Sequence, residues 1–88
     1  MSPYRVELRP AAVRAMRKLD PPLRHRVHGA IALLAQDPRP PAARALKGRP
    51  GLRIRVVGDY RIIYTVKDDV LLVVVVVTLG HRRDVYDR

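Results

Sequence analysis

Residues 4–8 alternate between apolar and charged side chains, which is the two-residue period of a half-buried β-strand. The apolar spacing then changes to three and four residues, as on one face of an α-helix. Pro10 suits the first turn of one helix. Asp20, followed by two prolines, predicts the N-cap of a second helix that ends near Gln36. Two helices joined so closely are expected to form an antiparallel hairpin.

Strand patterns fill the second half of the chain. Residues 52–56 alternate, so Arg53 and Arg55 are expected on one face and the aliphatic side chains on the other. A Gly-Asp turn should lead into a returning strand at 60–66, which is rich in β-branched and aromatic residues. Residues 70–79 show no polar alternation, which predicts a central strand buried on both faces.

The order of these elements predicts an α+β fold in a single domain that spans residues 1–88. It consists of an N-terminal strand, a helical hairpin and a three-stranded antiparallel meander. The prolines at 38–41 predict a stiff connector, followed by a helical turn at 42–46. Because the helices can cover only one face of the sheet, the face that carries Arg53 and Arg55 should be partly open.

The charge of the chain narrows the class of partner. It has 18 Lys and Arg against 8 Asp and Glu, a formal net charge of +10. Such a field favours a nucleic acid or an acidic protein. An anionic membrane is the weakest option, because no predicted helix pairs a basic face with exposed aromatic residues. Alternatively, a general bias toward arginine in the amino-acid usage accounts for part of this charge, and those arginines are ordinary solvated surface residues.

The absence of cysteine excludes disulfides, thiol nucleophiles and Cys-ligated metal sites. Three histidines with a single Glu make no convincing metal site, so no metal or cofactor is expected; His25 and His28 are interpreted as structural or solvent-facing. No secretory segment opens the chain, and the run at 70–79 is shorter than the ~20 residues that span a bilayer. These features predict a cytoplasmic protein without a membrane partner.

Basic side chains are expected to gather on the meander, where Arg61 opens the strand next to Arg53 and Arg55. Guanidinium groups bind phosphate bidentately and stay charged at any working pH. In RNA the ribose 2′-OH can attack the adjacent phosphate without a metal and leave a 2′,3′-cyclic end. That reaction needs a base and an acid, for which His81 and Tyr86 are candidates. Each residue also has an ordinary interpretation: solvated arginines, a turn histidine, and a tyrosine whose ring covers the core.

Three segments carry a resemblance that covers essentially the whole chain: Leu46-Lys47-Gly48, GDYRIIY at 58–64 and GHRRDVY at 80–86. They resemble toxins of the RelE/ParE superfamily of type II toxin–antitoxin systems, and the RelE branch in particular. The resemblance implies a RelE-like fold and an endoribonuclease that cuts mRNA codons in the A site of the bacterial 70S ribosome. It also implies a cognate antitoxin, through which the toxin would contact operator DNA.

The same resemblance assigns roles to individual residues. Arg53 and Arg55 match a basic pair, Arg61 a phosphate-binding arginine, Arg82 a transition-state arginine and Tyr86 the C-terminal tyrosine. The residues expected to contact RNA are Lys47, Arg49 and Arg83.

One departure from the family pattern matters for the chemistry. RelE enzymes carry lysines where this chain has Arg53 and Arg55. Arginine keeps the charge, but its pKa is too high for a general base. The resemblance therefore leaves base catalysis to His81 or Tyr86.

Two alternatives remain open at this point. ParE-type toxins share the fold but poison DNA gyrase and have no nuclease site, and one fold readily hosts different functions. A degenerate toxin that only binds its antitoxin is the third interpretation.

Overall fold

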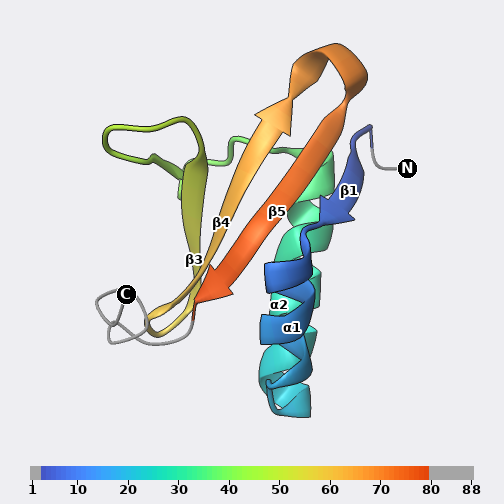
Figure 1. Ribbon diagram of the computed structural model, residues 1–88, viewed down its shortest axis with the longest axis vertical. Helices are drawn as coiled ribbons and strands as arrows, with labels where there is room; N and C mark the ends of the chain where they lie inside the picture. The colour runs from blue at the N-terminus through green and yellow to red at the C-terminus, as the bar shows by residue number, and fades with distance from the viewer. Residues whose placement is uncertain (1–2, 80–88) are drawn as a thin grey trace.

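The structure is a computed structural model that describes residues 3–79. Its elements are β1 (Arg5–Leu8), α1 (Pro10–Arg17), α2 (Pro21–Gln36), β2 (Arg44–Ala45), β3 (Leu52–Val57), β4 (Tyr60–Lys67), the 3₁₀ helix η1 (Asp68–Val70) and β5 (Leu72–Leu79). Figure 1 shows the two helices side by side, with the sheet running from β1 next to them to β3 at the opposite side. The expected α+β class is confirmed.

The strands form one five-stranded sheet in the order β1-β5-β4-β3-β2. The meander β3–β4–β5 is antiparallel as predicted, and β1 adds to it as a parallel neighbour of β5. Parallel neighbours need a long crossover, and the chain between β1 and β5 provides it. The sequence pattern predicted β1 but not the strand beside which it lies.

The predicted helical turn at 42–46 is wrong, because this segment contains β2. The backbone turns at the two prolines, where Ala43 N–H donates to the Pro40 carbonyl over 2.9 Å. Arg44 then pairs with Arg53 of β3. Pairing with the open edge of β3 satisfies backbone groups that one isolated helical turn would leave unpaired.

The core lies between the helices and one face of the sheet. Alternate residues of β4 point into it, because successive side chains of a strand face opposite sides. The largest fully buried side chains are Tyr64, Leu34, Ile62, Val27, Val73 and Val75. The Tyr60 hydroxyl donates to Thr78 Oγ1 over 2.8 Å, so this buried polar pair is satisfied.

The prediction that the last strand is buried on both faces holds for only part of β5. Val73, Val74 and Val75 are buried in succession, whereas Val76 is 36% exposed. The change follows the length of β1, whose last residue, Leu8, pairs with Val75. Beyond that point no strand of residues 3–79 pairs with β5 on this side.

Arg24 of α2 contacts the end of α1, whereas the predicted side-chain N-cap of α2 does not form. Asp20 occupies the N-cap position of α2, but its side chain makes no capping hydrogen bond. Arg24 instead reaches the C-terminal end of α1, donating to the carbonyls of Leu19 over 2.7 Å and Met16 over 3.3 Å. The Met16 carbonyl also accepts the Leu19 N–H over 3.2 Å, so Arg24 adds a second hydrogen bond at the end of α1. Neither helix among residues 3–79 is long and apolar enough to cross a membrane.

Candidate functional site

Four arginines from three neighbouring strands line one cavity of about 310 Å³. Arg53 and Arg55 come from β3 and Arg61 from β4, as expected from the sequence; Arg44 of β2 is the fourth. The remaining lining residues are Ala42 and Ile54. We call this cavity, with its four arginines, the arginine site.

The register of the strands places these arginines in directly opposed pairs. Arg55 faces Arg61 across β3 and β4, and Arg44 faces Arg53 across β2 and β3. Side chains in such pairs have Cβ atoms roughly 5 Å apart, and like charges there are destabilising. The register shifts beside Arg55, at a β-bulge before Val57, and bulges are typical of strands that re-aim a side chain. An anion between the guanidinium groups would relieve the repulsion.

No carboxylate of residues 3–79 forms an ion pair with the arginine site. Arg61 Nε donates to the Asp59 carbonyl over 3.4 Å, and Arg44 Nη1 donates to the carbonyls of Pro41 and Ala43. These bonds orient the guanidinium groups, whose charge no carboxylate in the described part of the chain neutralises. Because Arg61 is half-buried and the other three are exposed, the site is open to a large ligand.

The other expected site residues fall into two groups. Lys47 and Arg49 are exposed in the β2–β3 connection and do not line the arginine site. Gly48 takes a φ of 73° in this connection, a conformation that favours glycine. The expected residues outside the described range are His81, Arg82, Arg83 and Tyr86.

Arg44 is the member of the site that the sequence analysis missed. A helical turn was expected for its segment, so its pairing opposite Arg53 was not foreseen. A two-residue strand is too short to show a period. The only available signal was its position after a proline-rich connector and before a strand with exposed arginines.

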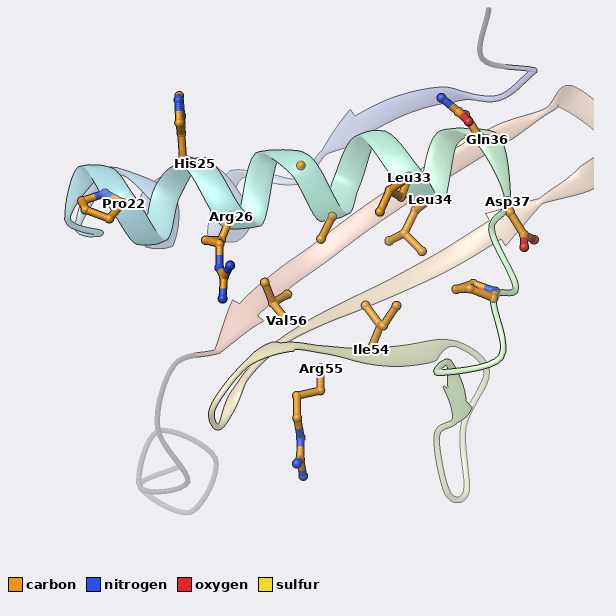
Figure 2. Close-up of a pocket in the computed structure, with 13 residues that line it drawn as sticks. Pro22, His25, Arg26, Leu33, Leu34, Gln36, Asp37, Ile54, Arg55 and Val56 are labelled. Atoms are coloured by element: carbon orange, nitrogen blue, oxygen red, sulfur yellow. The ribbon is translucent and has the colours of Figure 1, made fainter.

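A second, larger cavity of about 950 Å³ runs between α2 and β3. Figure 2 shows Ile54 and Val56 pointing from β3 toward α2, whereas Arg55 points away from the helix. Arg53 and Arg61 line only the arginine site and Val56 lines only the larger cavity, whereas Ile54 and Arg55 border both. Leu33 on α2 is 67% exposed at this apolar groove, and Arg26 of the same helix extends toward Val56. We call it the α2–β3 groove.

A polar cluster ties three distant segments together at the other end of the sheet. Arg39 donates two hydrogen bonds to Asp68, of 3.1 and 2.8 Å, and the Tyr4 hydroxyl donates a third of 2.7 Å. Hydrogen bonds from Arg39, and then from Tyr4, lower the pKa of Asp68 to about 2. Nearby, the buried Tyr64 hydroxyl donates to the Pro38 carbonyl over 2.6 Å, and burial raises the pKa of Tyr64 to about 12.

Comparison with known families is decisive for the class of protein. The profile of the ParE toxin of type II toxin–antitoxin systems matches residues 6–86. The chain belongs to this toxin family. A search of curated protein sequences found no significant match.

The fold of this ParE-family toxin is also similar to solved structures of RelE toxins. It is similar to the intact RelBE toxin–antitoxin complex of E. coli (TM-score 0.79, 26% identity, covering 91% of this chain and 99% of that one). The RelBE2 complex of Mycobacterium tuberculosis gives a TM-score of 0.78 at 26% identity, and the match covers 90% of this chain and 99% of that one. The isolated E. coli RelE toxin gives a TM-score of 0.76 at 26% identity, and the match covers 96% of this chain and 92% of that one. Membership of the RelE/ParE superfamily, predicted from the sequence, is confirmed.

Proposed function

We propose that this RelE/ParE toxin is a ribosome-dependent mRNA endoribonuclease. The observation that carries the proposal is the arginine site, in which four guanidinium groups from three strands surround one cavity. Directly opposed cations destabilise the free protein. They are explained by a ligand with several negative charges, and the RNA backbone is such a ligand.

The site suits the charge that develops during RNA cleavage. Attack of a ribose 2′-OH on the adjacent phosphate passes through a pentavalent phosphorane, which carries more negative charge than the substrate. Fixed donors aimed at that charge are usually the largest catalytic contribution. Arg61, Arg53 and Arg55 would hold the phosphate oxygens, since guanidinium groups bind them bidentately.

The proton transfers require groups other than arginine, whose pKa exceeds ~12. One group must accept the 2′-OH proton and another must protonate the leaving 5′ oxygen. We assign these steps to His81 and Tyr86, and transition-state stabilisation to Arg82. Lys47, Arg49 and Arg83 would contact RNA outside the reacting phosphate. The arginines at 53 and 55, where RelE has lysines, make His81 and Tyr86 especially important in this chain.

The proposed protein partner is a cognate antitoxin. Two of the similar structures are toxin–antitoxin complexes. The α2–β3 groove offers an apolar surface of the kind that marks protein interaction sites. Because Arg26 extends over it and the chain carries a net charge of +10, a partner segment with apolar and acidic side chains fits best. Operator DNA would be contacted only through the antitoxin.

A second candidate function is supported by the family match itself. The matching profile is that of ParE toxins. A toxin of that type would bind and poison DNA gyrase without cutting RNA. A supercoiling assay with purified gyrase distinguishes the two functions, because only this alternative predicts inhibition.

Primer extension on a defined mRNA tests the nuclease. The mRNA is incubated with purified toxin, alone and on ribosomes stalled with an empty A site. The proposal predicts cuts only on the ribosome and only at the A-site codon. Cuts in free RNA would remove the ribosome from the mechanism, and absence of cuts by folded protein would overturn the nuclease.

A further inference from the structure

The connector from α2 to β2 ends at Arg44, and a series of contacts ties it to the body of the protein. Residues 37–43 include three prolines, whose rings fix φ and make the connector stiff. Arg39 N–H donates to Asp37 Oδ1 over 3.2 Å, and Ala43 N–H donates to the Pro40 carbonyl over 2.9 Å. These bonds define two successive turns, so a displacement at one end is transmitted to the other.

The first end of the connector is anchored to the sheet at two points. The Tyr64 hydroxyl, buried in β4, donates to the Pro38 carbonyl. One residue later, Arg39 makes its paired hydrogen bonds to Asp68 in η1. Two parallel N–H···O bonds fix direction as well as distance. The connector therefore starts from a defined position at the β4–β5 end of the sheet.

The second end of the connector holds the guanidinium of Arg44. Arg44 Nη1 donates to the Pro41 carbonyl over 2.8 Å and to the Ala43 carbonyl over 3.0 Å. The connector backbone is thus the direct support of this side chain. Within the described residues, these two bonds are the hydrogen bonds of the Arg44 side chain, and β2 itself has two residues at the edge of the sheet.

We propose that Arg39, Asp68 and Tyr64 are positioning residues that set the place of Arg44 in the arginine site. The inference rests on the proposed function to the extent that Arg44 contacts an RNA phosphate. The Arg39–Asp68 pair acts through the connector and does not touch RNA. Its loss lets the connector shift and moves Arg44 away from the position that its partners in the site require.

The proposal and simple electrostatics predict opposite changes in RNA affinity when Asp68 loses its charge. Asp68→Asn removes a carboxylate and raises the net charge by one. A long-range field alone would then strengthen RNA binding. Loss of positioning weakens it. The matched control is Glu7→Gln, which makes the same charge change in the Glu7–Arg9 pair of 3.9 Å, and Arg9 lines none of the arginine site.

A double-mutant cycle between Asp68 and Arg44 tests the proposal. Affinity for a short fluorescein-labelled single-stranded RNA is measured for Asp68→Asn, Arg44→Ala and the double variant. We expect Asp68→Asn to weaken binding about threefold when Arg44 is present and not to weaken it when Arg44 is absent. Tyr64→Phe should behave in the same way, and Glu7→Gln should not weaken binding. The charge-reversed pair Arg39→Asp with Asp68→Arg should restore most of the lost affinity.

Other results overturn the proposal in distinguishable ways. Additive effects of the two substitutions, with melting temperatures reduced alike in both backgrounds, would make the Arg39–Asp68 pair purely structural and leave the arginine site intact. If Arg44→Ala binds RNA with wild-type affinity, Arg44 makes no contact with RNA, and its position cannot matter for binding. Cleavage of ribosome-bound mRNA by the same variants would then show whether the proposed nuclease activity holds even though the positioning role is wrong.

Discussion

Arg55 and Arg61 stand directly opposite each other on β3 and β4, and no carboxylate of the described residues forms an ion pair with either. Like charges in this arrangement destabilise the folded protein when no anion is bound. This arrangement is the expected state of a surface selected for binding an anion, where part of the stability of the free protein is given up for function.

The first prediction concerns that repulsion. Arg55→Gln should raise the free energy of unfolding of the free toxin by about 0.2–1 kcal/mol at low salt, because one of two opposed cations is removed. Chemical denaturation at low and high salt measures it. The gain should shrink in high salt, where the charges are screened. A loss of stability at low salt would show that Arg55 supports the fold.

The second prediction concerns the salt dependence of RNA binding. Each phosphate contact with single-stranded RNA contributes about −0.7 to the slope of log affinity against log salt concentration. Arg53→Ala should therefore make the slope shallower by about 0.7. Arg5→Ala on β1, at the opposite edge of the sheet, removes the same charge and should leave the slope unchanged. Equal changes in both variants would mean that RNA responds only to net charge.

The third prediction concerns acid stability. The pKa of Asp68 is lowered to about 2 by Arg39 and Tyr4. A carboxyl group whose pKa is lowered in the folded state stabilises the fold at pH values above its unfolded pKa near 3.8. This stabilisation is lost as the pH falls toward 2. Asp68→Asn should therefore be less stable than the wild type at pH 6, and the difference should disappear near pH 2. Melting temperatures across this range measure it, and a constant difference would contradict the shifted pKa.

The fourth prediction concerns the α2–β3 groove. Leu33→Glu places a charge on a side chain that is already 67% exposed, so the fold should tolerate it. An apolar, acidic antitoxin segment should bind at least tenfold more weakly, since a desolvated contact is replaced by a like charge. Val70→Glu is the matched control, because Val70 is 50% exposed and does not line the groove. Equal affinity of both variants for the cognate antitoxin would place the interface elsewhere.

Much of this architecture could be predicted from local patterns. The alternation at 52–56 correctly put Arg53 and Arg55 on the open face, and Arg61 was expected beside them. Arg44 was missed because its place depends on pairing with β3, which no local period reveals. The contact between Arg39 and Asp68 joins residues 29 positions apart, and nothing in the neighbourhood of either residue indicates the other. Pairings of this kind are set by the sheet register and the connector.

The central claim is that the arginine site cuts RNA, and single-turnover cleavage of ribosome-bound mRNA by Arg61→Ala tests it most directly. Arg5→Ala serves as the charge-matched control, and neither variant may melt below the wild type, so that a slower reaction cannot come from unfolding. Loss of one donor to the developing charge should slow cleavage about 10²–10³-fold in Arg61→Ala, while Arg5→Ala stays within about twofold of the wild type. Cleavage by Arg61→Ala at the wild-type rate would contradict the account.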